Sequence, residues 1–227
     1  TVVVKRITEG SITSPRHSVI FSDAEGRITD ATEFSDDIRP GQEISTNIMV
    51  INRMYLLNIL GDAAAHGYTS FFRDVIARNI HHANYHVYHY DGYYALVSSL
   101  AGYFDCSMQL LRADVRDALF GVAERPIYTK VRNSAPTIYR TGSSVGNTLI
   151  ADGCIIEGTV ENSIIFRGVK VGRGSVVRNS ILLQDTVVGS GVSLNCVVTD
   201  KNTVVRDGRV LSGHETMPFF IGKGIMV

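Results

Sequence analysis

A histidine-rich stretch, HHANYHVYHY at residues 81–90, is the densest group of side chains that could bind a metal or transfer a proton. On a strand, successive side chains alternate between faces, so His86 and His89 point in opposite directions. His81 and His82 fall at a predicted helix end, where the helix dipole favours histidine. This spacing predicts no metal site.

The segment DGYYALVSS at residues 91–99 poses a different question: whether it is an ordinary strand or a site that has lost a charge. Its sole acid, Asp91, precedes Gly92, and this pair is typical of a turn. No carboxylate follows within the apolar run. The residues alone leave both interpretations open.

Basic residues near the middle of the chain are candidates for binding a phosphorylated effector. Lys130, Arg132 and Arg140 lie in a stretch punctuated by proline, although solvated surface is the commoner use of such residues. Between residues 90 and 213 there is no histidine, and His214 alone follows. A hexapeptide-repeat acyltransferase typically uses histidine as its general base, so this distribution disfavours that activity.

Composition narrows the classes of function. The chain has 227 residues, is 44% hydrophobic, and carries 22 basic and 22 acidic side chains. A neutral chain has no surplus of positive charge for nucleic acid, and it is compatible with a subunit of an assembly. No run approaches the roughly 18 apolar residues of a membrane span, so no membrane partner is expected. Three distant cysteines, Cys106, Cys154 and Cys196, indicate packed thiols in a reducing compartment, here the cytoplasm.

The first part of the chain alternates strand-like and helix-like segments, which predicts a mixed α/β region. A hairpin is expected where the turn sequence DAEG separates residues 17–22 from 26–30. A helix is expected from Arg53 until Gly67 ends it. Its apolar face would comprise Met54, Leu57, Leu60 and Ala64. Further strands are predicted at 2–7, 44–52, 85–90 and 93–97. A second helix is predicted at 71–80, capped by Thr69 or Ser70, with Phe72, Ile76 and Ile80 on one face. One long helix is predicted from Ser98 or Ser99 through Val115.

Residues 143–205 form a repeat with a period of 17. The segments VENSIIFRGVKVG, VRNSILLQDTVVG and LNCVVTDKNTVV begin at 160, 177 and 194, and a shorter copy begins at 147. Aliphatic residues recur about every six positions and are often followed by glycine, which is the hexapeptide pattern of a β-helix. The positions in phase are Val160, Val177 and Leu194; Ile164, Ile181 and Val198; and Val171, Val188 and Val205. We predict about four coils, with a β-sandwich of accidental spacing as the alternative.

These patterns predict a domain at residues 1–122, a connector at 123–142, and a β-helix with a C-terminal tail at 143–227. Phe219 and Phe220 could dock that tail on the β-helix or on a neighbouring subunit. The sequence opens without methionine on the strand-like run VVVK, so we expect a further segment upstream.

Three stretches closely resemble the bacterial ADP-glucose pyrophosphorylase (glucose-1-phosphate adenylyltransferase) family, and most closely its GlgD-type regulatory subunit. They are PIYTKVRNSAPTIY, NTLIADGCIIEGTVENSIIFRGVKVG and VTDKNTVVRDG, beginning at residues 126, 147 and 198. The resemblance implies the back part of a Rossmann-type nucleotidyltransferase domain followed by a left-handed parallel β-helix. The family's glycine-rich ATP loop has no counterpart in this sequence.

Active family members carry three motifs that the resemblance places on this chain. Where the family has EKP, this chain has Glu33 at the acid and Phe34 at the glucose 1-phosphate lysine. Where the family has SMG, Ser45 is kept and Asn47 replaces the glycine. Where the family has GYWRDVGT, Leu96 stands at the aspartate that helps to hold Mg²⁺.

The resemblance implies that the chemistry has been lost. Leu96 offers no oxygen to Mg²⁺, Phe34 cannot offset phosphate charge, and a Cβ on Asn47 would crowd the sugar. Glu33 and Ser45 then remain as vestigial substrate-binding positions. We expect no catalytic residue, no metal and no cofactor in this chain, whereas the parent family uses Mg²⁺ and ATP.

The resulting hypothesis is a non-catalytic, regulatory subunit of glucose-1-phosphate adenylyltransferase in glycogen biosynthesis, inactive by itself. Its expected partner is the catalytic subunit, in a homo- or hetero-oligomer, expected to be a tetramer. The alternatives are an active sugar-phosphate nucleotidyltransferase with a shifted metal site, and a hexapeptide-repeat assembly module or acyltransferase. The effector and the stoichiometry stay open.

Overall fold

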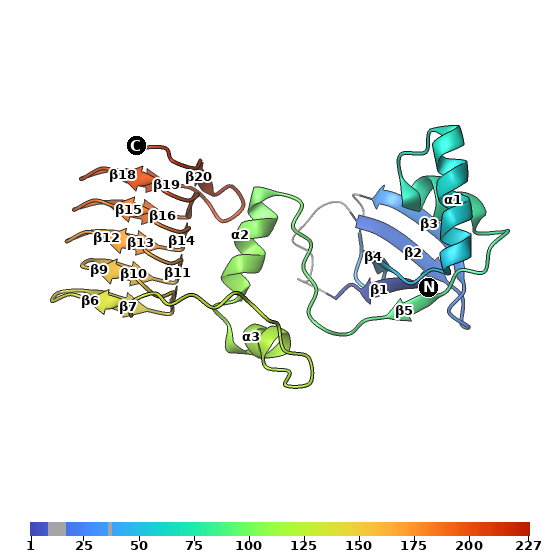
Figure 1. The fold of residues 1–227 in the computed structure, drawn as a ribbon, viewed down its shortest axis with the longest axis horizontal. Helices are drawn as coiled ribbons and strands as arrows, with labels where there is room; N and C mark the ends of the chain where they lie inside the picture. The colour runs from blue at the N-terminus through green and yellow to red at the C-terminus, as the bar shows by residue number, and fades with distance from the viewer. Residues whose placement is uncertain (9–16, 36–37) are drawn as a thin grey trace. The chain divides into compact units, whose positions relative to one another are not determined.

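The computed structural model of the chain describes residues 1–8, 17–35 and 38–227, without the side chain of Phe34. It divides into two compact units, Thr1–Leu96 and Val97–Val227 (Figure 1). This division falls earlier than the expected domain boundary at residue 122. The difference arises because the helices that follow residue 99 group with the solenoid, onto which Phe104 packs.

The first unit is built on a five-stranded sheet with the order β3-β2-β4-β1-β5. Strand β5 runs parallel to β1, and the other neighbours are antiparallel. The predicted hairpin of β2 and β3 is confirmed, and Asp23 Oδ1 holds its turn by accepting the backbone N–H groups of Glu25 and Arg27 at 3.2 and 2.8 Å. The strands are β1 (Val2–Arg6), β2 (His17–Ser22), β3 (Ile28–Ser35), β4 (Glu43–Met49) and β5 (Val87–His89).

Helix α1 (Arg53–His66) has the predicted ends but not the predicted buried face. Asn52 Oδ1 caps its first turn, and Gly67 ends it in the left-handed conformation with φ 65°. The expected core positions Met54, Leu57 and Leu60 are exposed, and so is Ala64. Ile59 is the buried residue of the helix instead. A helical period therefore identified the helix, but it did not identify which side meets the sheet.

The next helical segment is confirmed at its predicted position, in a wider form. Element η1 (Phe72–Ala77) is a π-helical turn, and the backbone N–H of Arg73 donates to Ser70 Oγ at 3.2 Å. Its predicted apolar face is confirmed, because Phe72, Ile76 and Ile80 are all buried. They form one core with Val2, Val4, Ile20, Ile28 and Tyr85.

The strand predicted at residues 93–97 is wrong, and the turn expected at Asp91 and Gly92 does not join two paired strands. The segment is irregular, and β5 pairs with β1 in parallel. Lys5 Nζ donates to the carbonyl oxygens of Asp91 and Gly92, both at 2.8 Å. These bonds fix the segment across the end of β1, and a contact 86 or more residues apart in sequence is invisible to local turn rules.

The single long helix predicted through Val115 is two helices, α2 (Leu100–Gln109) and α3 (Ala113–Phe120). Ser99 is the predicted cap, and its Oγ accepts the backbone N–H of Gly102 at 3.0 Å. No helix of the described residues is both long and apolar enough to cross a bilayer.

The second unit contains the predicted β-helix as a parallel β-solenoid (Figure 1). Three parallel sheets each stack five strands, which corresponds to four steps from coil to coil. The first strand lies at Ile138–Tyr139, inside the segment expected to be a connector. The strands are β6 (Ile138–Tyr139), β7 (Ser144–Gly146), β8 (Leu149–Ile150), β9 (Ile155–Ile156), β10 (Thr159–Glu161), β11 (Ile164–Ile165), β12 (Lys170–Val171), β13 (Val176–Arg178), β14 (Ile181–Leu182), β15 (Val187–Val188), β16 (Ser193–Asn195), β17 (Val197–Thr199), β18 (Val204–Val205), β19 (Val210–Ser212) and β20 (Phe219–Ile221).

Strand register confirms all three predicted phases of the repeat. Val177 pairs with Val160 below it and with Leu194 above it. In the other two sets the middle residue likewise pairs on both sides: Ile181 with Ile164 and Val198, and Val188 with Val171 and Val205. At a corner, a Cβ on Gly172 would collide with the carbonyl oxygen of Gly189, so coil stacking itself requires glycine there.

One sheet of the solenoid, that of β8, β11, β14, β17 and β20, is buried on both faces over its central strands. Ile165 and Leu182 point into the solenoid interior. Their neighbours Ile164 and Ile181 pack outward against Phe104 of α2. Adjacent residues of these strands are therefore both buried, one on each face of the sheet. Aliphatic doublets such as Ile181-Leu182 are the signal of this second burial.

Asparagine side chains form a ladder along one corner of the solenoid. Asn147 Nδ2 donates to Asn162, Asn162 donates to Asn179, and Asn179 donates to Asn195, at 2.8, 2.7 and 2.9 Å. The first three residues have φ between 44° and 46°. Asparagine tolerates this left-handed conformation better than most residues. At this corner it therefore fits the backbone, and its side-chain amide also forms the hydrogen bonds of the ladder.

The C-terminal tail docks on the solenoid as its last strand. In β20, Phe219 and Phe220 pair with Val197 and Val198 of β17, and Ile221 is buried. The three cysteines are free, and Cys154 and Cys196 are buried, as expected for packed thiols. Burial raises the pKa of both thiols.

Candidate functional site

The predicted acid Glu33 lies on β3 and is held by the beginning of η1. Ser70 Oγ donates a hydrogen bond to Glu33 Oε1. Arg73 Nη1 lies 3.7 Å from Glu33 Oε2. The carboxylate is therefore paired within the protein, and its side chain is largely buried.

Asp74 forms the other half of this cluster. Arg73 Nε donates to Asp74 Oδ1 at 3.0 Å, and the backbone N–H groups of Thr69 and Ser70 donate to Asp74 Oδ2, both at 3.0 Å. The hydrogen bond from Arg73, followed by those from the two backbone groups, holds the pKa of Asp74 well below its usual value. One guanidinium thus pairs two carboxylates.

Ser45 and Asn47 lie in β4 at an irregularity of the β1–β4 pairing. Ser45 is buried, and its Oγ accepts the backbone N–H of Asn47 at 3.1 Å. Asn47 has φ 61°, a backbone shape that favours glycine. The position where the resemblance places a family glycine therefore keeps a glycine-like backbone, but it carries an exposed amide side chain.

Leu96 is half-buried at the end of the first unit, in an irregular segment. Its side chain has no oxygen, and the two acids of the Arg73 cluster, Glu33 and Asp74, are already engaged by Ser70 and Arg73. Mg²⁺ requires hard oxygen ligands in an open octahedral set, so these residues do not fit the metal that the family implies. Within residues 1–8, 17–35 and 38–227, no three His, Cys, Asp or Glu side chains are grouped to hold a metal ion.

The structure joins the predicted positions only in part. Glu33 and Ser45 belong to one sheet, but their hydrogen-bond partners differ. The side chain of Phe34 lies outside the described residues. Sequence reasoning missed the role of Arg73, although the adjacent Arg–Asp pair in FFRDV was a signal.

Residues considered for other activities are exposed or make contacts with near neighbours. His214 Nδ1 lies 2.9 Å from Thr216 Oγ1 in an exposed turn, a position that does not favour an acyltransferase base. Lys130 and Arg132 are exposed, and Arg140 Nε lies 3.9 Å from Glu157 Oε1. Effector binding by these three residues stays a prediction.

The chain is similar to proteins named for glycogen biosynthesis and to glucose-1-phosphate adenylyltransferases. It is 43% identical over 139 residues to the glycogen biosynthesis protein GlgD of Bacillus subtilis (strain 168), covering 61% of this chain and 40% of that protein. It is 49% identical over 118 residues to GlgD of Geobacillus stearothermophilus, covering 52% and 34%. It is 30% identical over 168 residues to the glucose-1-phosphate adenylyltransferase of Thermotoga maritima (strain ATCC 43589 / DSM 3109 / JCM 10099 / NBRC 100826 / MSB8), covering 72% and 39%.

The family described as GlmU-like, C-terminal hexapeptide, matches residues 135–216, in agreement with the solenoid. The resemblance predicted from sequence is therefore confirmed. The chain spans 34% to 40% of the length of these curated relatives.

Proposed function

We propose that this chain, a relative of GlgD glycogen biosynthesis proteins and of glucose-1-phosphate adenylyltransferases, is part of a regulatory, non-catalytic subunit of the adenylyltransferase in glycogen biosynthesis. The parent reaction converts ATP and glucose 1-phosphate to ADP-glucose and pyrophosphate. We place this function in the cytoplasm, in an oligomer with the catalytic subunit, with a tetramer as the expected form.

The observation that carries the proposal is the self-paired state of the acidic cluster. Glu33 and Asp74 share the guanidinium of Arg73. In an adenylyl transfer, metal and cations must neutralise phosphate charge in the transition state. A carboxylate pair closed by arginine and serine cannot take up the metal without breaking these bonds, and Leu96 supplies no replacement ligand. The residues of this unit thus preserve a shape without supplying the charges.

The solenoid supports an assembly role within the same proposal. Its terminal strands leave apolar residues exposed, among them Val210 and Phe220 in the last coil. A rigid stack of parallel strands offers fixed surfaces for contacts between subunits. Regulation would then act through such contacts, with Lys130, Arg132 and Arg140 as candidates for binding a phosphorylated effector.

The proposal is tested by measuring ADP-glucose synthesis with the full-length protein that contains this chain. It is assayed alone, and then mixed with the catalytic subunit from the same organism while fructose phosphates are varied. We expect no activity alone and a changed turnover or effector response in the mixture. Activity alone would contradict the proposal in favour of an active nucleotidyltransferase. Inactivity of the protein alone, with unchanged turnover and effector response of the catalytic subunit on mixing, would instead favour a passive assembly module.

A further inference from the structure

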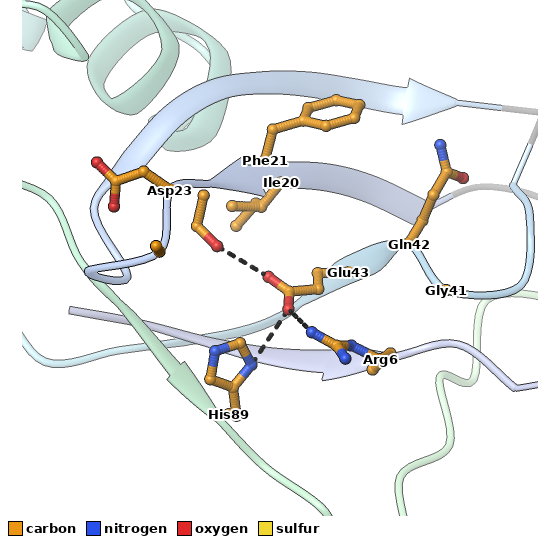
Figure 2. Close-up of a pocket in the computed structure, with 10 residues that line it drawn as sticks. Arg6, Ile20, Phe21, Asp23, Gly41, Gln42, Glu43 and His89 are labelled. Carbon is orange, nitrogen blue, oxygen red and sulfur yellow. Dashed lines mark hydrogen bonds and ion pairs between the residues drawn. The ribbon is translucent and has the colours of Figure 1, made fainter.

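A second polar cluster lies at the turn end of the first unit's sheet, around Glu43 (Figure 2). Arg6 Nη2 and His89 Nδ1 approach Glu43 Oε1 at 3.1 and 3.2 Å. Ser22 Oγ donates to Glu43 Oε2 at 3.3 Å. Gln42 also lines the pocket, whose volume is about 600 Å³. Neither the proposed function nor the vestigial site uses these residues.

Strand register makes this cluster rigid. Glu43 is paired directly with Arg6 on β1 and with Ile20 on β2. Ser22 lies two residues after Ile20, so it returns to the same face of the sheet. His89 comes from β5 on the far side of β1. Four polar side chains from four neighbouring strands therefore converge without relying on a mobile loop.

The side chains of the cluster differ in exposure: Glu43 is buried, whereas Arg6 and His89 are accessible to a ligand. The Glu43 side chain is 9% exposed, whereas those of Arg6 and His89 are 66% and 49% exposed. An arginine has five N–H donors, and only one of them is directed at Glu43. Figure 2 shows the second ring nitrogen of His89 directed away from the carboxylate. Donors and acceptors thus remain available beside one another at the mouth of the pocket.

The charges of the cluster disfavour small ions as ligands. A phosphate would be attracted by Arg6 but repelled by the buried carboxylate of Glu43 beside it. A metal cation would meet the reverse problem, because Arg6 and His89 already approach Glu43 Oε1. A hydroxyl group is matched by this arrangement, since it donates one hydrogen bond and accepts others.

We propose that the Glu43 pocket binds a neutral saccharide through vicinal hydroxyls, with Arg6 as donor, and with Glu43 and the ring nitrogen of His89 that faces away from it as acceptors. The Phe21 ring lines the pocket but points away from the carboxylate in Figure 2, so hydrogen bonds rather than ring stacking carry the contact. The ligand chemistry could come from a free hexose or from the end of an α-glucan. This inference goes beyond the regulatory role and does not require a catalytic partner.

The test is a titration of this whole chain, followed by NMR chemical shifts, with glucose, maltotetraose and inorganic phosphate as separate probes. We expect glucose or maltotetraose to shift resonances of Arg6, Glu43 and His89, and phosphate to leave them unchanged. Glucose binding as tightly as maltotetraose identifies a free hexose site, whereas preference for maltotetraose identifies a glucan-end site. No response to either saccharide, or a response to phosphate at these residues, overturns the proposal.

A matched pair of variants assigns the binding to the pocket. Arg6→Ala should weaken saccharide binding about tenfold or more, because it removes charged donors from the mouth. Arg112→Ala is the control, since Arg112 is 67% exposed and pairs with Asp114 in the other unit at 2.6 Å. Equal binding by the Arg6→Ala chain and the unaltered chain would contradict the assignment. Both arginines are exposed, so loss of folding does not obscure the result.

Discussion

The solenoid and the α/β unit differ in the sequence distance over which their contacts form. In the solenoid, residues in phase meet after 17 positions, and every predicted set of the repeat pairs in register. In the α/β unit, Lys5 bonds to Gly92 and Ser70 bonds to Glu33, across 87 and 37 residues. The spacing of a repeat predicts which residues pack together. In a mixed sheet, by contrast, the contacts join residues that are far apart in sequence and that no local pattern connects.

The largest test of this contrast compares two leucines. Leu182 is fully buried in the solenoid interior, whereas Leu57, which helical spacing assigned to a core, is 51% exposed on α1. We expect Leu182→Ala to lower the free energy of unfolding by about 2–5 kcal/mol, because it leaves a cavity between stacked coils. Leu57→Ala should change it by no more than about 0.5 kcal/mol. Denaturant unfolding followed by circular dichroism measures both.

Hydrogen exchange shows where the Leu182→Ala loss falls. We expect reduced protection in the strands above and below β14, and unchanged protection in β1 to β4. An equal loss of stability from the two leucine variants would break the contrast, because Leu57 would then be as well packed as Leu182.

A smaller effect is expected at the asparagine ladder, where the repeat specifies backbone shape as well as packing. Asn179 has φ 46° and bonds to both Asn162 and Asn195. Asn179→Gly keeps the left-handed backbone and loses the ladder, so we expect a cost of about 1–2 kcal/mol. Asn179→Ala should cost about 1 kcal/mol more, because a Cβ disfavours that conformation. Equal unfolding free energies for the two variants would show that the corner does not depend on φ.

The fold could be predicted from the sequence more completely than the candidate site. The period of 17 predicted the stacking of Val160, Val177 and Leu194, since one rule fixes all coils. The spacing of Met54, Leu57 and Leu60 predicted a helix but the wrong buried face, because the side that meets the sheet depends on distant strands.

The candidate site was predictable only where one residue type decides the chemistry. Leu96 could be identified as unable to bind a metal from its side chain alone, with the resemblance supplying its place. The pairing of Glu33 and Asp74 by Arg73 was not predictable, because it depends on β3 meeting the start of η1. The Glu43 cluster was missed for the same reason, since its four side chains come from four strands.

The smallest expected change in stability concerns charge. It is tested by comparing one aspartate–arginine pair in each unit. Asp74 is 8% exposed and paired with Arg73, whereas Asp114 is 64% exposed and paired with Arg112. Asp74→Asn keeps an acceptor for the backbone N–H groups of Thr69 and Ser70 and removes only the charge. We therefore expect a lower melting temperature at pH 7, with a smaller loss than for Leu182→Ala or Asn179→Ala.

The pH dependence identifies the charge of Asp74 as the cause. Its folded pKa lies below the ordinary value of 3.8, so its ionised form stabilises the fold at pH values above 3.8. That contribution is lost as the pH falls through the lowered pKa, because the carboxylate must then be protonated in both states. The melting-temperature advantage of the unaltered chain over Asp74→Asn should therefore be full at pH 5–7 and shrink below pH 4. Asp114→Asn should show almost no difference at any pH, since solvent screens an exposed pair. If the melting-temperature difference between the unaltered chain and Asp74→Asn stayed constant down to pH 2, the shape of the Asp74 side chain and not its charge would be the cause. The buried pair would then differ from the exposed pair in packing alone.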